Sequence, residues 1–102
     1  MSARYVLAPQ AVFDLVEIWQ YIRERADIGV ADRVESVIRE RIVFLSDSPG
    51  AGHSRRDLTA EDVKFFPVYS CLIVYLPETR PLQVVSIIHR RRDVAGILEE
   101  RL

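Results

Sequence analysis

Six cationic side chains are the residues of this chain best able to do chemistry. They are Arg55, Arg56, Lys64, Arg90, Arg91 and Arg92. Guanidinium groups make planar, two-point contacts to carboxylates and phosphates, so these residues are candidates for binding an anionic partner. The alternative is that they are solvated surface charges, partly paired with Asp57, Asp62 and Asp93. That alternative is the commoner explanation for any one arginine, but a weaker one for the whole set.

Two histidines, His53 and His89, lie near these cations in the sequence. Strand alternation would put His89 on the face of Val85 and Ile87, which favours a hydrogen-bonded structural role over that of a general base. Two histidines and the single Cys71 give little support for a metal site, and we expect neither a metal nor a cofactor. The sequence also lacks a Walker loop, a glycine-rich dinucleotide fingerprint and a nucleophile elbow.

The triple arginine follows residues 82–89, the most strand-like segment of the chain. The β-branched residues of this segment are typical of a strand buried on both faces. Segments 63–68 and 69–76 are also strand-like, and the short joins between the three segments predict antiparallel pairing. If the outer two strands flank the middle one, the cations at both ends of this region can lie along one sheet.

Two amphipathic helices precede these strands. Apolar residues recur every three or four positions between residues 12 and 22, and again between residues 30 and 45. The break at residues 27–29 is short, which predicts an antiparallel helical hairpin. In the first helix, we expect an apolar face of Val12, Leu15, Val16, Trp19 and Ile22, with Asp14, Glu17 and Glu24 on the other side.

The remaining elements are short. Residues 4–7 are strand-like, and Pro9 suits the first turn of the helix that follows. Residues 50–61 are typical of an exposed basic loop, and Asp93 is a suitable N-cap for a final short helix. The predicted order is β-α-α-β-β-β-α, an α+β fold in which a helical hairpin packs on a small antiparallel sheet.

The composition agrees with one compact domain over residues 1–102. The apolar fraction is 49%, which is sufficient for a hydrophobic core. A formal net charge of −1 argues against a general nucleic-acid coat, which would be strongly basic. No segment has the pattern of a signal peptide or a membrane-spanning helix, so we expect a soluble cytoplasmic protein.

Six short motifs occur in a fixed order along nearly the whole chain. They are AVFDLVEIWQYI at residues 11–22, DSPGAG at 47–52, DL at 57–58, VKFFPV at 63–68, LIVY at 72–75 and IIHRRRD at 87–93. In this order the motifs resemble the ParE/RelE superfamily of bacterial toxin–antitoxin toxins, also called plasmid stabilisation proteins. The fold that this resemblance implies, a helical hairpin on an antiparallel sheet, agrees with the fold inferred from the residues.

The resemblance implies one of two activities. RelE-like members cut messenger RNA on the ribosome and often use a C-terminal Tyr or His, whereas ParE-like members inhibit DNA gyrase. Beyond Asp93 this sequence has neither Tyr nor His, and its pI near 6.1 suits a ribosomal RNA surface poorly. Gyrase inhibition is therefore favoured, and the candidate catalytic residues of the alternative, a nuclease, are Lys64, Arg91 and His89. A non-toxic member that only binds its partner is a third interpretation.

Either branch implies a cognate antitoxin as a partner. In this superfamily an acidic, amphipathic antitoxin segment wraps the toxin, adding apolar anchors and sometimes a strand. Grooves along the helical hairpin would receive the anchors. Lys64 and the arginines at 55, 56 and 90–92 would meet the carboxylates. We therefore interpret the triple arginine first as a surface for a protein partner, and second as a phosphate site.

Overall fold

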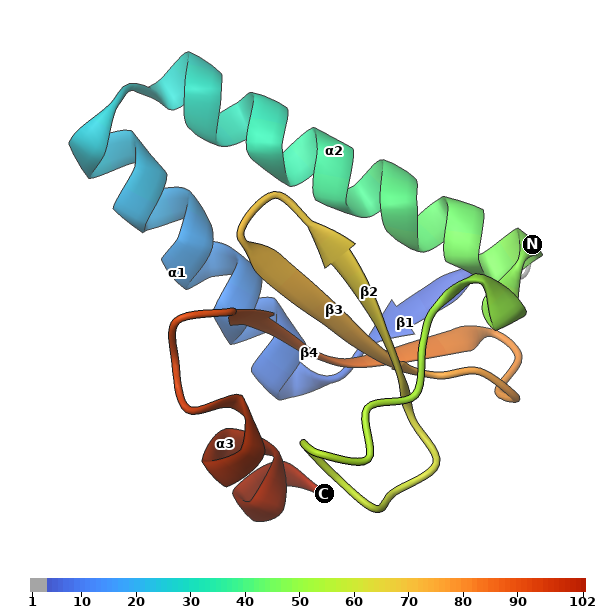
Figure 1. Cartoon of the computed structure of the whole chain (residues 1–102). Helices are drawn as coiled ribbons and strands as arrows, with labels where there is room; N and C mark the ends of the chain where they lie inside the picture. Colours follow the sequence, from blue (N-terminus) through green and yellow to red (C-terminus); the bar gives the residue numbers. More distant parts are fainter. Residues whose placement is uncertain (1–3) are drawn as a thin grey trace.

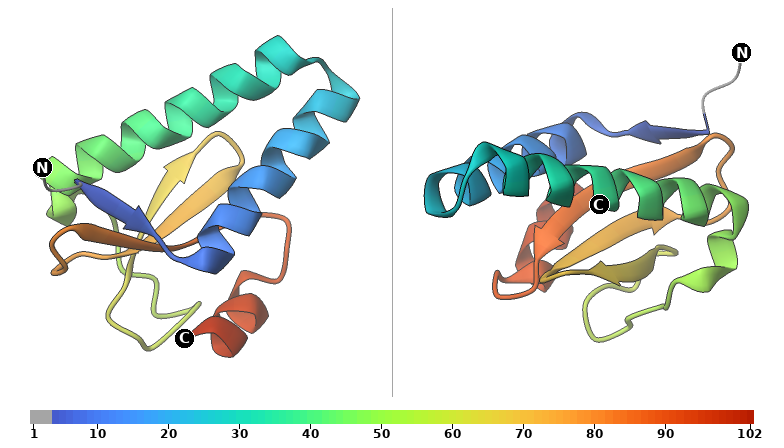
Figure 2. Two further views of the ribbon diagram at one scale, coloured as in Figure 1. Left: turned by 180° about the vertical axis from the view of Figure 1, so that it is seen from behind. Right: turned by 90° about the horizontal axis from the view of Figure 1, so that it is seen from above.

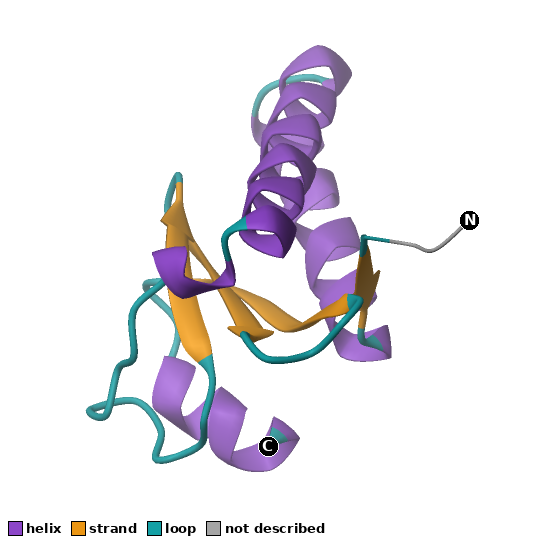
Figure 3. Cartoon of the chain, turned by 90° about the vertical axis from the view of Figure 1, so that its right-hand side faces the viewer, coloured by secondary structure: helices purple, strands orange, loops and turns teal. Residues whose placement is uncertain are grey.

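The computed structural model describes residues 4–102, which fold into three layers. A four-stranded sheet lies between a helical hairpin on one face and a C-terminal helix on the other (Figures 1 and 3). The elements are β1 (Tyr5–Leu7), α1 (Pro9–Arg25), α2 (Ile28–Asp47), a 3-10 turn (Pro49–Ala51), β2 (Lys64–Val68), β3 (Cys71–Leu76), β4 (Leu82–His89) and α3 (Val94–Arg101). The predicted α+β fold and its element order are confirmed.

The sheet is mixed rather than wholly antiparallel. Its strand order is β1-β4-β3-β2, and β3 pairs antiparallel with both β2 and β4, as predicted. β1 pairs in parallel with the first half of β4, with Tyr5 opposite Leu82 and Leu7 opposite Val84. Parallel pairing requires a long connection, which the helical hairpin and the β2–β3 pair supply here. The antiparallel pairing predicted for β2 to β4 is therefore confirmed, and β1, which was predicted only as a short strand, adds a parallel pair.

A β-bulge in β4 changes which face its side chains occupy. The pairing between β3 and β4 shifts register between Val74 and Tyr75, so that Val85 is the extra residue. Val85 packs in the core on the α3 side, whereas Ile87 packs in the core under the helical hairpin. The expectation that His89 shares a face with both residues is therefore wrong for Val85.

Two apolar cores cover the two faces of the sheet. The core under the hairpin includes Ala11, Leu15, Ile38, Ile42, Leu45, Val68, Ile73, Tyr75, Val84 and Ile87. The core under α3 comprises Val63, Phe65, Leu72, Val74, Ile88, Val94 and Leu98. β3 supplies side chains to both cores and is buried from residue 71 to residue 75. A central strand that is apolar throughout is thus explained by cover on both sides.

Local signals account for the helix ends. α1 begins at Pro9. Proline is tolerated in a first turn because a backbone N–H at that position would have no acceptor within the helix. The Asp27 side chain caps α2 by accepting from the Val30 N–H at 2.8 Å. As predicted, Asp93 caps α3, accepting from the Gly96 N–H at 3.1 Å.

The buried face of α1 differs from the expected face. Ala11, Asp14 and Leu15 are buried, whereas Val12 and Val16 are each 46% exposed and line a shallow groove beside α2. The apolar spacing identified the helix but not the side that faces the sheet, because α1 carries apolar residues on both sides of Leu15. The outward position expected for Asp14 is wrong.

Tyr75 fixes the turn that follows α2. Its hydroxyl donates to the Pro49 carbonyl oxygen at 2.8 Å and accepts from the Gly52 N–H at 2.9 Å. Gly52 is buried at this point. A Cβ on Gly52 would collide with the Tyr75 hydroxyl and would lie 2.9 Å from the Phe65 carbonyl oxygen. The sequence needs glycine here for space.

We expect Gly52→Ala to lower the free energy of unfolding by about 1–3 kcal/mol, because the new methyl group must displace a buried tyrosine or a strand carbonyl. Urea denaturation followed by circular dichroism measures this change. Gly50→Ala is the matched control, since nothing lies within 4 Å of a Cβ at Gly50. Equal losses in the two variants would contradict the steric explanation.

Candidate functional site

The triple arginine lies where β4 leaves the sheet, and it separates two clefts. Arg90 lines the cleft on the α3 side, Arg91 lines the groove on the hairpin side, and Arg92 lines both. Among residues 4–102, no carboxylate forms an ion pair with any of these three side chains. Their charges are therefore available to a ligand.

The first cleft, which we name the hairpin groove, lies beneath the closed end of the hairpin. This end projects past the sheet (Figure 2). The groove encloses about 640 Å³. Its apolar wall is formed by Ile18, Tyr21, Ile22, Val30 and Val34, and its rim includes Tyr69, His89, Arg91 and Arg92. An apolar wall with a basic rim suits an amphipathic segment that carries acidic residues.

Tyr69 stands at the tip of the turn between β2 and β3, on the rim of the hairpin groove. Its backbone has a φ of 53° and the residue is 57% exposed. This left-handed conformation costs a non-glycine residue roughly 1 kcal/mol. Tyrosine and arginine are the residue types enriched at the energetically important positions of protein interfaces, and Tyr69 and Arg91 line the same groove.

The second cleft, which we name the arginine cleft, lies between α3 and the loop before β2. It encloses about 530 Å³. Its polar lining is His53, Arg55, Arg90, Arg92 and Asp93, and its apolar lining is Leu58, Phe65, Pro67, Leu72, Val94 and Ala95. Arg55 is paired with Asp57, to which its guanidinium donates two hydrogen bonds of 2.9 and 2.8 Å. These bonds raise the pKa of Arg55 and lower the pKa of Asp57.

The structure brings together only part of the predicted set of cations. Arg55, Arg90 and Arg92 meet in the arginine cleft. Arg56 instead pairs with Asp62 at 3.5 Å and donates to the Ala60 carbonyl oxygen. Lys64 begins β2 opposite Tyr75, at the strand end away from the arginines, so about 13 Å of strand separates it from that end.

The three candidate nuclease residues do not line one cleft. His89 and Arg91 both line the hairpin groove, and the His89 Nδ1 accepts from the Arg91 N–H at 3.1 Å. This bond agrees with a structural role for the histidine. Lys64 lines neither the groove nor the arginine cleft.

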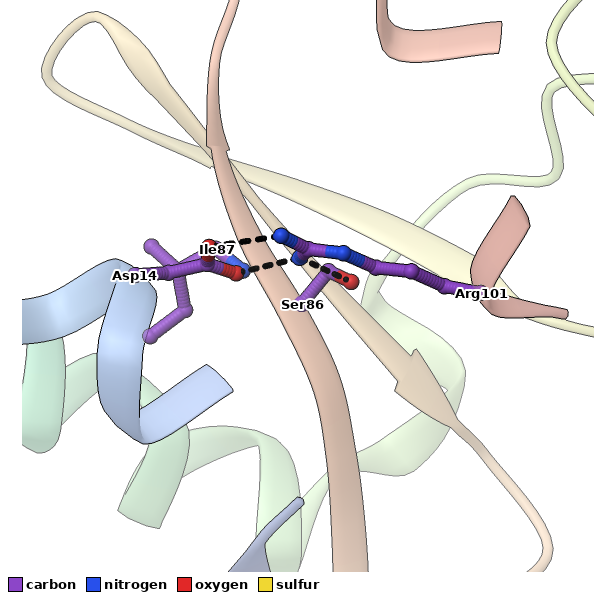
Figure 4. Close-up of polar contacts among 4 residues, drawn as sticks. All are labelled: Asp14, Ser86, Ile87 and Arg101. Carbon is purple, nitrogen blue, oxygen red and sulfur yellow. Dashed lines mark hydrogen bonds and ion pairs between the residues drawn. The ribbon is translucent and has the colours of Figure 1, made fainter. Parts of the chain in front are cut away.

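A buried ion pair that sequence reasoning missed holds α3 in place (Figure 4). Asp14 on α1 accepts from Arg101 on α3 through both carboxylate oxygens, at 2.7 and 3.0 Å. Arg101 also donates to the Ser86 hydroxyl at 3.0 Å. The two charged side chains are only 4% and 19% exposed. Hydrogen bonding to Asp14 raises the pKa of Arg101, so the guanidinium stays charged.

The position of Asp14 follows from the length of β1. β1 ends opposite Val84, so the edge of β4 has no strand partner beyond that residue. The Asp14 carboxylate accepts from the Ile87 N–H at 2.9 Å and so satisfies this edge. One signal of this ion pair is present in the sequence, an acid among the apolar residues of the first helix. The partner could not be identified from sequence spacing, because Arg101 lies 87 positions away.

Comparison with known proteins assigns the chain to a family. The model of the ParE toxin of type II toxin–antitoxin systems, parDE, matches residues 5–94. The chain therefore belongs to this family, and the resemblance inferred from the motifs is confirmed. A solved structure described as a chromosomal ParDE TA system from P. aeruginosa shares the fold, with a TM-score of 0.71 at 15% identity, covering 83% of this chain and 92% of that chain. Among curated proteins, none matches.

Within the described part of the chain, no helix combines the length and the hydropathy needed to cross a membrane. Residues 4–102 also contain no group of three His, Cys, Asp or Glu side chains that could hold a metal ion.

We expect Arg101→Met to lower the free energy of unfolding by about 2–4 kcal/mol, because it leaves the Asp14 carboxylate buried without a counter-ion. Urea denaturation measures the loss. The double variant Asp14→Asn, Arg101→Met removes both charges and keeps an oxygen that can accept from the Ile87 N–H. It should be more stable than Arg101→Met alone, and a double variant less stable than the single one would contradict the buried-charge explanation.

Proposed function

We propose that this protein is the toxin of a type II toxin–antitoxin module, that a cognate antitoxin neutralises it by docking in the hairpin groove, and that its target is DNA gyrase. The observation that carries the proposal is the hairpin groove itself, with an apolar wall and arginines that have no ion-pair partner among residues 4–102. Membership of the ParE family supports the role as a toxin.

The charges of the groove favour an acidic antitoxin segment. Arg91 and Arg92 stand on its rim, and the carboxylate of Asp14 is already neutralised by Arg101. Glu17 is the remaining acid in the lining. An amphipathic segment with carboxylates toward the arginines and apolar side chains toward Tyr21 and Ile22 would therefore match both parts of the groove.

Gyrase is favoured over messenger RNA as the target. A nuclease of this fold needs an acid or base beside its phosphate-binding cations. Lys64 is distant from Arg91 and His89, and the C-terminal helix supplies neither Tyr nor His. The arginine cleft, where His53 lies beside Arg55 and Arg90, is the one observation that keeps RNA cleavage as a second candidate.

We expect the double change Arg91→Glu, Arg92→Glu to weaken antitoxin binding at least about tenfold, because the antitoxin carboxylates then meet like charges. Biolayer interferometry with the purified antitoxin measures the dissociation constant. The same variant should be less toxic on induction.

The matched control is Arg33→Glu, Arg41→Glu, which changes the net charge equally at two exposed positions of α2 that do not line the groove. This control should bind the antitoxin with nearly wild-type affinity. Equal weakening in the two double variants would mean that net charge, rather than the groove, governs binding.

Inducing the toxin without antitoxin separates the candidate targets. We expect filamentous cells with DNA-damage signalling, and inhibition of gyrase supercoiling by the purified protein, both reversed by antitoxin. Rapid loss of translation with cleaved transcripts would instead indicate the nuclease. Normal growth at full expression would indicate a non-toxic member that only binds its partner.

A further inference from the structure

Arg92 lines both the hairpin groove and the arginine cleft. Its backbone is held on both sides. The Arg92 N–H donates to the His89 carbonyl oxygen at 3.0 Å, and the next residue, Asp93, caps α3. The backbone of Arg92 is thus fixed between the two clefts, and only its side chain can turn toward one or the other.

The arginine cleft has the features of a phosphate site. Arg90 and Arg92 enter it without carboxylate partners among residues 4–102. The first residues of α3, Val94 and Ala95, also line it, so the N-terminus of that helix faces the cleft. Asp93 lies in the lining as well; its Oδ1 accepts from the Gly96 N–H, and its negative charge is outnumbered by Arg90 and Arg92.

The floor of the arginine cleft is apolar. Leu58, Phe65 and Leu72 line it, and Phe65 and Leu72 are buried. The cleft volume of about 530 Å³ is within the range of small-molecule sites. Cations at the rim and an apolar floor suit a phosphate ester attached to a flat, weakly polar group. A nucleotide unit has this chemistry.

We propose that the arginine cleft binds a phosphate-bearing ligand of nucleotide size, and that this ligand competes with the antitoxin for Arg92. The competition rests on the proposed docking of the antitoxin in the hairpin groove. A guanidinium that makes a two-point contact to phosphate in one cleft is withdrawn from carboxylates in the other. Thermodynamic linkage then requires each ligand to weaken the other by the same factor.

The first experiment titrates pyrophosphate into the free toxin by isothermal calorimetry, with sodium chloride added to hold the ionic strength constant. We expect saturable binding that is weakened at least about tenfold in Arg90→Gln and Arg92→Gln. Arg33→Gln removes an equal charge outside both clefts and should bind like the wild type. An absence of binding, or equal weakening in all three variants, would overturn the proposed site.

The second experiment measures the affinity of the toxin for its antitoxin with and without saturating pyrophosphate. We expect the wild-type affinity to fall about fivefold, at the lower end of common coupling strengths. At the same pyrophosphate concentration, the effect should be much smaller in Arg92→Gln, which lacks the shared group, and in Arg90→Gln, which has a weakened anion site. An unchanged wild-type affinity, or an undiminished effect in Arg92→Gln, would overturn the competition.

The outcomes also separate this inference from the proposed function. Antitoxin binding that tolerates Arg91→Glu, Arg92→Glu removes the groove as the docking site and with it the competition, whatever pyrophosphate does. Normal groove docking without competition refutes only the inference. Replacing pyrophosphate by ADP or by a single-stranded tetranucleotide identifies the source of the phosphate, since the stronger competitor distinguishes a free nucleotide from a nucleic-acid backbone.

Discussion

The contact on which the rest of the structure depends is the buried pair of Asp14 and Arg101. Removing two charges from water costs free energy, and further hydrogen bonds to both partners are needed to offset that cost. The carboxylate receives two N–H groups from Arg101 and one from the backbone of Ile87, and the guanidinium also reaches Ser86. One interaction thus connects α1, the free edge of β4 and the C-terminal helix.

α3 needs this connection because it is short. It has eight residues, of which Val94 and Leu98 are buried. An isolated helix of this length is not stable in water, since helix nucleation is unfavourable and few turns follow it. Asp93 fixes its first turn and Arg101 fixes its last. The position of α3 in turn defines the arginine cleft, whose wall includes Val94 and Ala95.

The sequence predicted the elements better than it predicted which residues meet. Periodicity, caps and turn residues identified both long helices, the four strands and the final helix, because those signals are local. The errors at Asp14 and Val85, and the separation of Lys64 from the arginines, have long-range causes. Because β1 is short, part of the β4 edge has no strand partner, and Asp14 binds there. A β-bulge places Val85 on the opposite face of the sheet from the one expected. Strand register places Lys64 at the end of β2 that lies away from the arginines. None of these can be read from spacing along one segment.

The three adjacent arginines follow β4 in the turn that leads to α3. His89 ends β4 and lines the hairpin groove; in the turn after it, Arg90 lines the arginine cleft, Arg91 lines the hairpin groove and Arg92 lines both. A chain with a net charge of −1 thus presents concentrated positive charge at one end of its sheet. Such a local field attracts an acidic partner to that end whatever the net charge of the whole molecule, because screening limits distant charges more than near ones.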